Sequence, residues 1–134
     1  MKRRIRGLNE QVSGEEEVLE GVFLVQVERA FYKYHTHKPF FSLRLKILEP
    51  RQHQGKTLFG RLYSTEKALW KLSWFLRDFG YDRELLARGE IEDRALVGLH
   101  GVLKASRVMV NGQPLLNLEG FAPAGNWEEY SGAA

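Results

Sequence analysis

Cysteine is absent from the 134-residue chain, proline occurs only four times, and no apolar run is long enough to cross a lipid bilayer. The lack of cysteine excludes disulfides, zinc sites with thiolate ligands and cysteine nucleophiles, and it favours a cytoplasmic location. The first six residues are basic, but polar and acidic residues follow them, so we expect no secretory signal. The length fits one domain with a modest hydrophobic core.

Motifs of the common enzyme classes are also missing. The chain has no glycine-rich phosphate loop of the type G-x-x-x-x-G-K followed by Ser or Thr, no H-E-x-x-H and no G-x-S-x-G. A metal-dependent nuclease would need clustered carboxylates beside a basic groove, whereas Glu49 is the only acidic residue between positions 29 and 63. His35 and His37 could share a strand face, but a metal needs a third ligand and no acidic residue lies nearby. We therefore expect a non-catalytic protein without a metal or cofactor.

Positive charge is concentrated in one part of the chain, although the formal net charge is only +3. Residues 29–63 contain eight Lys or Arg and one Glu, together with three of the four histidines. Residues 7–28, by contrast, contain six Glu and no Lys or Arg. Segregated positive charge is typical of proteins that bind polyanions, although the count alone would still favour an ordinary solvated surface.

Residues 40–63 predict two strands, each with one apolar face. In residues 40–47 apolar and polar side chains alternate, as in a strand with one face toward a core. The apolar set is Phe41, Leu43, Leu45 and Ile47, and the opposite set is Ser42, Arg44 and Lys46. After a turn over residues 49–55, a second strand begins at Lys56. Its two faces consist of Leu58, Gly60 and Leu62, and of Phe59, Arg61 and Tyr63.

If Leu58 and Leu62 join the core, Phe59 and Tyr63 remain outside beside Arg61. Aromatic rings and cations on an open sheet face suit single-stranded nucleic acid, because bases stack on the rings and phosphates meet the cations. The alternative is that another element covers this face and the aromatic residues belong to the core. Such a layer would also bury the three cations of the face without partners, which is costly. We therefore favour the exposed arrangement.

Another strand is predicted over residues 18–31, after a flexible charged tail over residues 1–17. Near the start of this strand both faces are apolar, which indicates coverage on both sides or a bulge that changes the phase. Residues 32–39 form a linker rich in aromatic and basic side chains. The linker could fold over a bound strand as a clamp. Alternatively, it is a hairpin connection whose tyrosines form ordinary cross-strand pairs.

The hydrophobic period changes after Tyr63 and predicts a helix that ends at Gly80. Ser64 or Thr65 is the expected N-cap, and Glu66 lies in the first turn. The expected apolar stripe consists of Ala68, Leu69, Leu72, Phe75, Leu76 and Phe79, with Trp70 and Trp74 packing at its edge. A shorter helix over residues 82–88 and a connecting turn over residues 91–95 follow.

Two further strands are predicted over residues 96–110 and 115–121, joined by Asn111-Gly112, the strongest short hairpin signal. Three strands, a helix and a hairpin are the element order of an OB-fold. We therefore expect a mainly β domain over residues 18–127, a five-stranded OB-fold-like barrel with an α-helix between strands 3 and 4, and a C-terminal tail over residues 128–134. OB-folds bind oligonucleotides on strands 2 and 3 and with the loops joining strands 1–2 and 4–5. The second of these loops is short and uncharged, so we expect little from it beyond a polar contact.

A family resemblance follows from the same layout. Gly21 opens the first strand, Gly55-Lys56 precedes the third, a Leu/Trp-rich helix comes next, and an Asn-Gly hairpin comes late. From residue 21 to about residue 123 the chain resembles the phage-type single-stranded-DNA-binding proteins encoded near recombination genes. The resemblance implies an OB-fold, binding of single-stranded DNA in replication, recombination or repair, no cofactor and no catalysis. The chain lacks the acidic C-terminal tip of the better-known bacterial single-stranded-DNA-binding proteins, so partner recruitment through its tail is not expected.

These observations predict a single-stranded nucleic-acid-binding protein in the cytoplasm of a bacterium or a phage-infected cell. The predicted contact residues are Lys33, Tyr34, Lys38, Arg44, Lys46, Lys56, Phe59, Arg61 and Tyr63. DNA is the expected partner, and RNA remains open because no residue visibly addresses a 2′-hydroxyl. A homo-oligomer or a recombination protein is a further candidate partner, whereas a membrane is not. The alternative function is a protein-interaction or assembly domain that uses the same aromatic face.

Overall fold

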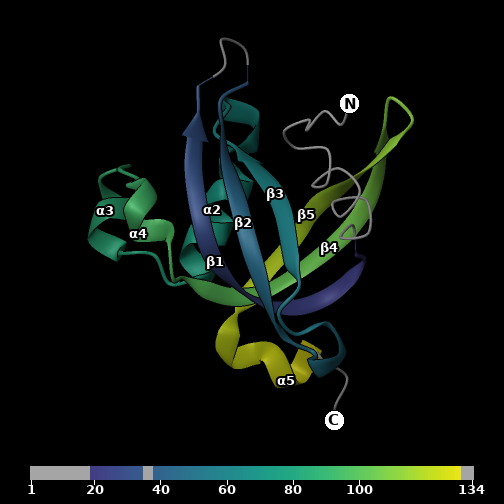
Figure 1. The fold of residues 1–134 in the computed structure, drawn as a ribbon. Helices are drawn as coiled ribbons and strands as arrows, with labels where there is room; N and C mark the ends of the chain where they lie inside the picture. The colour runs from purple at the N-terminus through teal and green to yellow at the C-terminus, as the bar shows by residue number, and fades with distance from the viewer. Residues whose placement is uncertain (1–18, 35–37, 131–134) are drawn as a thin grey trace, which may run out of the picture.

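The computed structural model describes residues 19–34 and 38–130, which form one five-stranded antiparallel sheet with short helices around it (Figure 1). In the order of their hydrogen-bonded pairing, the strands are β3, β2, β1, β4 and β5. Their bounds are β1 Gly21–Lys33, β2 Phe40–Glu49, β3 Thr57–Tyr63, β4 His100–Val110 and β5 Gln113–Pro123. The helices are η1 Arg51–His53, η2 Glu66–Ala68, α2 Leu69–Asp78, α3 Arg83–Ala87, α4 Asp93–Leu96, η3 Ala124–Asn126 and α5 Trp127–Tyr130, where η marks a 3-10 helix.

The alternation expected in β2 and β3 is present. Every apolar residue assigned to the inner face is buried, and these side chains form the core together with α2 and the inner face of β1. The alternation in β1 is interrupted by a bulge at Glu28. Val27 pairs with Leu45 and Arg29 pairs with the adjacent β2 residue, Arg44, so Glu28 is the extra residue between them. The bulge reverses the direction of the side chains, so that Val27 and Ala30 are both buried. The predicted strand over residues 18–31 was therefore right in kind, although β1 runs on to Lys33.

Helix α2 covers one end of the core by packing against β3 and β5. Leu72, Phe75, Leu76 and Phe79 are buried, as predicted, and Gly80 follows with a positive φ of 84°. Leu69 was predicted to belong to the buried stripe, which is wrong: it is 48% exposed. The expected N-cap hydrogen bond is also missing, because the Ser64 hydroxyl donates to the carbonyl oxygen of Pro39 instead and Thr65 makes no side-chain cap.

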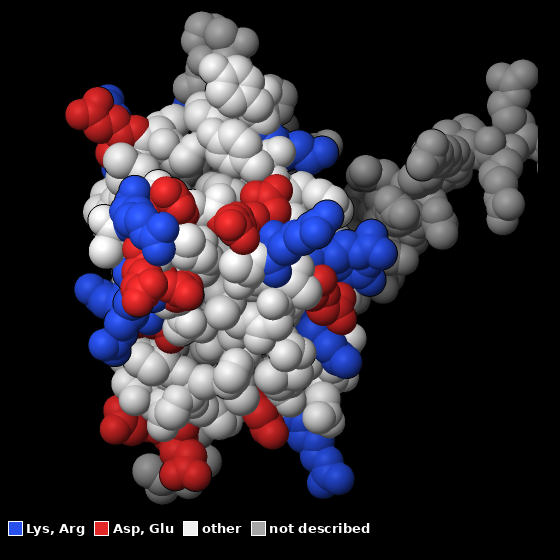
Figure 2. Space-filling view, turned by 90° about the vertical axis from the view of Figure 1, so that its left-hand side faces the viewer, with Lys and Arg blue, Asp and Glu red and all other residues white. Residues whose placement is uncertain are grey.

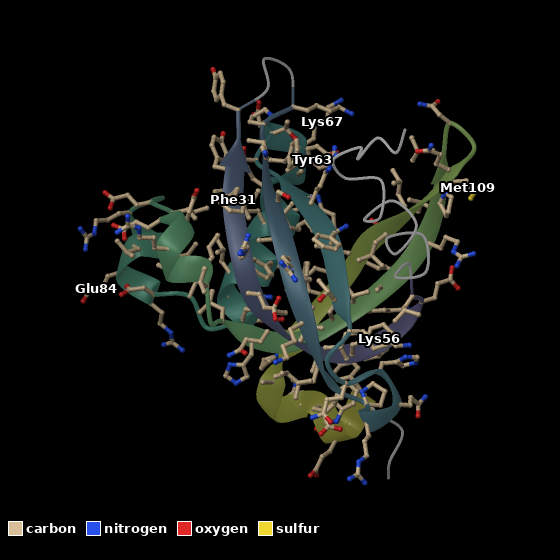
Figure 3. The ribbon with its side chains drawn as sticks, viewed as in Figure 1. Phe31, Lys56, Tyr63, Lys67, Glu84 and Met109 are labelled. Carbon is tan, nitrogen blue, oxygen red and sulfur yellow. The ribbon has the colours of Figure 1, made fainter. Side chains whose placement is uncertain are left out.

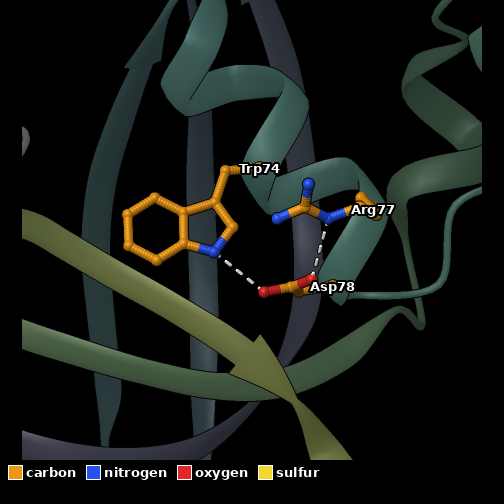
Figure 4. A network of polar contacts seen from close by, with 3 residues as sticks. All are labelled: Trp74, Arg77 and Asp78. Atoms are coloured by element: carbon orange, nitrogen blue, oxygen red, sulfur yellow. Dashed lines mark hydrogen bonds and ion pairs between the residues drawn. The ribbon is translucent and has the colours of Figure 1, made fainter.

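The last turn of α2 fixes the orientation of Trp74 (Figure 4). The indole Nε1 donates a hydrogen bond of 2.8 Å to Oδ2 of Asp78, one turn further along the helix. The other carboxylate oxygen of Asp78 accepts from Nε of Arg77 at 3.2 Å. The Trp74 ring then meets Phe121 of β5 edge-on, with 5.5 Å between the ring centroids, so the polar contact and the packing hold the same side chain.

Two short helices follow α2. Asp82 caps α3 by accepting hydrogen bonds from the backbone N–H groups of Glu84 and Leu85. The connecting turn predicted over residues 91–95 is largely helix α4, and the strand predicted to begin at residue 96 begins at His100. Leu96 is the last residue of α4 and is buried in the core. The apolar run that follows residue 95 in the sequence therefore belongs to two elements.

The hairpin between β4 and β5 has the predicted Asn-Gly turn, with positive φ at Asn111 (51°) and Gly112 (78°). At the other end of these strands, η3 and α5 lie against β4. Trp127 at the start of α5 is half-buried, and Val102 on the outer face of β4 is buried. The outer face beside the start of β1 is thus covered, which accounts for its apolar residues.

The two edge strands, β3 and β5, meet at one point. Gly60 of β3 lies against Leu118 of β5 so closely that a Cβ atom at position 60 would be 2.7 Å from Cδ2 of Leu118. Within the described residues no hydrogen-bonded ladder joins these two strands, and the β4–β5 hairpin extends away from the sheet (Figure 1). The predicted mainly β, OB-like fold with a helix between β3 and β4 is confirmed, except that the barrel is not closed.

No helix in the described part of the chain has the length and apolar character needed to span a bilayer.

Candidate nucleic-acid interface

The ladders of β2 define an ordered outer face. Residues directly opposite each other in an antiparallel pair project to the same side of the sheet. Arg44 pairs with Phe59, Ser42 with Arg61, and Phe40 with Tyr63. The side chains therefore form three rows across β2 and β3, and an aromatic ring occupies the first and third rows. Arg61 lies between the two aromatic positions of β3.

None of the described elements covers the centre of this face. Phe59 is 58% exposed and Arg61 is exposed, while Tyr63 is half-buried. A single exposed apolar side chain is ordinary on a protein surface, but a larger exposed apolar patch often marks a binding site. The sequence-based choice of an exposed over a covered arrangement is thus correct for Phe59 and Arg61.

Arg44 is not the free cation that the sequence indicated. Its Nε lies 3.1 Å from Oε2 of Glu28, the bulge residue of β1. This contact is an ion pair rather than a well-aligned hydrogen bond, because Nε has no partner that meets hydrogen-bond geometry. The guanidinium carbon also lies 5.9 Å from the centroid of the Phe59 ring. The sequence did not indicate Glu28 as a partner of Arg44, because Glu28 precedes the basic segment and reaches the face only through the bulge.

The end of the face at which Phe40 pairs with Tyr63 holds a cluster of aromatic and basic groups. Phe40 is only 6% exposed although it projects outward, because its neighbours cover it. The Arg61 guanidinium carbon lies 4.5 Å from the Phe40 ring centroid, and the Tyr63 ring centroid lies 5.6 Å from it. Nζ of Lys38 lies 5.9 Å from the centroid of Tyr63. These cation–π contacts hold Arg61 and Tyr63 in place beside the open ring of Phe59.

A groove of about 450 Å³ runs between this face and the β4–β5 hairpin. From β2 and β3 it is lined by Ser42, Phe59, Gly60, Arg61 and Tyr63, and from the hairpin strands by Val108, Val110, Leu115, Leu116, Asn117 and Leu118. The groove exists because β3 and β5 separate beyond the contact between Gly60 and Leu118. Three of the residues predicted to bind nucleic acid thus line one concave surface.

The hairpin is the part of this surface that the sequence analysis underestimated. Val108, Met109, Val110 and Leu115 are all exposed, and three of them line the groove. The expectation of no more than a polar contact from this loop was based on its turn residues alone. Apolar residues on both sides of an Asn-Gly turn, at positions too far from the core to be buried, were the signal that could have indicated an apolar wall.

The remaining predicted residues lie toward the two ends of the sheet, and Figure 3 shows Lys56 far from Tyr63. Lys33 and Tyr34 lie at the same end of the sheet as Tyr63, and Tyr34 is exposed. Lys46 is exposed and opposite Thr57, toward the other end of β3. Lys56 lies beyond Thr57, at the end of the sheet away from Tyr63, where its Nζ is 3.2 Å from Nδ1 of His53. Lys56 is therefore not brought together with the groove.

The linker over residues 32–39, predicted as a possible clamp, is described only in part. Residues 35–37, which include His35 and His37, lie outside the described residues. Tyr32 belongs to the inner side of β1, where its ring packs 4.9 Å from Phe41 and its hydroxyl is 3.2 Å from Oγ of Ser64. In the described ranges no group of three or more His, Asp or Glu residues could hold a metal ion.

Charge is arranged differently on the neighbouring side of the molecule. Figure 2 shows the side that carries α3 and α4, where acidic and basic side chains are interspersed. Glu84 and Arg88 form a long ion pair of 3.7 Å there. A polyanion would meet both signs of charge on that side, so the outer face of β2 and β3 is the better electrostatic match.

One lysine behind the groove, Lys71, has a lowered pKa. Nζ of Lys71 in α2 donates to Oδ1 of Asn117 at 3.4 Å, and Nδ2 of Asn117 donates to Oγ of Ser106 at 3.1 Å. Burial lowers the pKa of Lys71 from its usual value of 10.5, and the negative charge of Glu119 opposes part of this shift. The chain of contacts joins α2 to both strands of the hairpin, so it supports the base of the groove wall.

No protein-family model matches the chain, and no curated protein is similar enough to count as a match.

Proposed function

We propose that this protein binds single-stranded nucleic acid, with DNA as the expected form, on the outer face of β2 and β3 and in the adjoining groove. The observation that carries the proposal is the open ring of Phe59 beside Arg61, at the edge of a groove with an apolar far wall. Bases stack on open rings, and a groove with cations and apolar walls accommodates a strand whose bases are unpaired.

The two components of the surface have different roles in this proposal. Phe59 stacks on a base, and Arg61 meets a phosphate. Val108, Val110 and Leu115 contact the bases from the opposite side of the groove, where an apolar surface excludes water. Base pairs in a duplex would keep their faces stacked inside the helix, so a duplex could not use Phe59 in the same way. A role in recombination, replication or repair in a bacterial or phage-infected cell rests on the family resemblance alone, and no catalytic step is proposed.

The test is an anisotropy titration of a labelled oligothymidylate of about 16 nucleotides, the upper end of the usual footprint of one OB-fold. We expect affinity to fall between about 50 and 200 mM salt, with a slope of about 0.7 for each phosphate contact. A duplex of the same length should bind more weakly. A labelled RNA oligonucleotide of the same length, titrated in the same way, compares the affinity for RNA with the affinity for DNA. Affinity that is absent, or that does not change with salt, would overturn the proposal.

Two variants separate stacking from folding. Phe59→Ala should cost about 1–3 kcal/mol of single-strand affinity and leave the thermal midpoint nearly unchanged, because the ring is mostly exposed. Leu43→Ala is the matched control, since Leu43 is buried and its truncation should cost about 2–5 kcal/mol of stability. If Phe59→Ala instead leaves oligonucleotide binding intact but abolishes self-association in size-exclusion chromatography, the face is a protein interface.

A further inference from the structure

The bulge in β1 adds a third strand to the outer face. Because Glu28 is the extra residue, the side chains that point outward after it are Arg29, Phe31 and Lys33 rather than their neighbours. Arg29 and Lys33 are exposed, and Phe31 is 53% exposed. Without the bulge, the inward alternation of Val25 and Val27 would have continued to Phe31 and buried it.

The register aligns these residues with those of β2 and β3. Phe31 pairs with Ser42, which in turn pairs with Arg61. Two strand spacings of about 4.8 Å therefore separate Phe31 from Arg61 across the sheet. The side chain between them is the small Ser42, which itself lines the groove. Phe31 does not line the groove itself, but it lies opposite Ser42, the residue through which β2 contributes to the groove.

Two cations flank Phe31 on the outer face of β1. Arg29 and Lys33 stand two residues before and after Phe31 on the same face of β1. Two acidic residues lie nearby: Glu28 is paired with Arg44, and Oδ2 of Asp93 accepts a hydrogen bond of 3.1 Å from the backbone N–H of Tyr32. Tyr32, the intervening residue, points to the other side and packs on Phe41. On its outer face β1 thus presents an aromatic ring between two cations, about 10 Å from β3, which presents the cation Arg61 between two aromatic positions.

We propose that a single strand bound in the groove crosses β2 at Ser42 and stacks a further base on Phe31, while Arg29 and Lys33 meet its phosphates. This inference rests on the proposed function and extends it: the footprint spans three strands of the sheet. Oligonucleotides that end within the groove do not reach Phe31, whereas longer ones do. Affinity should therefore rise with length until the second ring is occupied.

The experiment compares oligothymidylates of about 4 and about 16 nucleotides, the two ends of the footprint range of one OB-fold. Phe31→Ala should lower affinity for the longer strand by about five- to 150-fold, the equivalent of 1–3 kcal/mol for one stacked base. It should leave affinity for the shorter strand unchanged. Phe31→Tyr, which keeps a ring, should restore binding of the longer strand, and the thermal midpoint of each variant reports on folding.

Phe59→Ala is the matched control, because it should weaken binding at both lengths. If Phe31→Ala leaves the longer strand unaffected while Phe59→Ala weakens it, the extension to β1 is wrong and the proposed function stands. An equal loss at both lengths, or a loss that follows a lowered thermal midpoint, also overturns the separate position on Phe31. If the wild-type protein binds neither strand, the proposed function itself fails.

Discussion

Glu28 and Arg44 are held together across the β1–β2 ladder, with 3.1 Å between Oε2 and Nε, at the centre of the face that is proposed to bind nucleic acid. Both side chains are partly exposed, so the pair itself adds little stability. A phosphate approaching Arg44 has to compete with the Glu28 carboxylate. The pair therefore reduces the positive charge that the face offers to a polyanion.

Replacing Glu28 by Gln should release Arg44 and increase single-strand affinity. If Arg44 then meets a phosphate, the salt slope should steepen by about 0.7. Arg44→Ala alone should change affinity little, and in the double variant the gain from Glu28→Gln should disappear. Anisotropy titrations at several salt concentrations measure both quantities. An equal gain with and without Arg44 would show that Glu28 acts by general charge repulsion and not through the pair.

The hairpin wall gives a second prediction. Leu115→Ser makes an exposed apolar residue of the groove polar without disturbing the core. It should weaken single-strand binding while the thermal midpoint stays nearly the same. Met109→Ser is the control, since Met109 is 65% exposed at the same hairpin but is not part of the groove lining. Equal effects of the two variants on affinity would argue against a specific role of the wall.

The contact between Trp74 and Asp78 gives a third prediction. Asp78→Ala should cost about 1.5–3 kcal/mol, because it removes a charge-assisted hydrogen bond from a half-buried indole. Asp78→Asn keeps one acceptor oxygen and should cost less. Arg77→Ala is the control on the other side of the carboxylate, and its exposed side chain predicts a loss of no more than about 1 kcal/mol. Urea unfolding measures stability, and near-ultraviolet circular dichroism reports on Trp74.

The sequence predicts most of the fold because the local patterns agree with each other. Alternation in β2 and β3, the helical stripe of α2 and the Asn-Gly turn all indicate the element that forms. Leu69 is the exception within α2: it lies in the first turn and continues the apolar stripe in sequence, yet it is exposed. Periodicity identifies which side chains share a face, but it does not say where packing against that face begins.

The candidate site is less predictable for a different reason. Glu28 and Phe31 take part in the outer face only because one inserted residue reverses the phase of β1, and no single residue in the sequence marks that bulge. The apolar wall of the groove depends on how far the β4–β5 hairpin extends beyond the sheet. Both features are properties of how strands are aligned in space, whereas Phe59 and Arg61 could be identified from the alternation of one strand.

The lowered pKa of Lys71 predicts a pH dependence of stability. At neutral pH the folded protein keeps this ammonium group in partly dehydrated surroundings, which destabilises it relative to the unfolded chain, where the pKa is near 10.5. Between the folded and unfolded pKa values the unfolded chain binds more protons, so the contribution of Lys71 to stability rises with pH. Lys71→Met removes this cost together with the hydrogen bond to Asn117, so its stability relative to the wild type should be highest at neutral pH. That relative stability should fall as pH approaches 10.5, as urea midpoints of both proteins at several pH values can show. A difference that stays constant with pH would contradict the prediction.

The close approach of Gly60 and Leu118 predicts that a side chain at position 60 destabilises the protein. In Gly60→Ala the added Cβ would lie 2.7 Å from Cδ2 of Leu118, closer than such atoms can approach, so β3 and β5 or the leucine must shift. Overpacking of this kind costs about 1–3 kcal/mol. Gly125→Ala is the control, because nothing lies within 4 Å of a Cβ atom there.

A double-variant cycle tests whether the contact itself causes the loss. Leu118→Ala alone should cost about 2–5 kcal/mol, because Leu118 is buried in the core. It also vacates the space that an alanine at position 60 needs, so the two substitutions together should cost less than the sum of their separate effects. Additive losses would show that Gly60 is required for another reason, such as strand flexibility. Since the separation of β3 from β5 beyond this contact forms the groove, Gly60→Ala should also alter single-strand affinity, whereas Gly125→Ala should not.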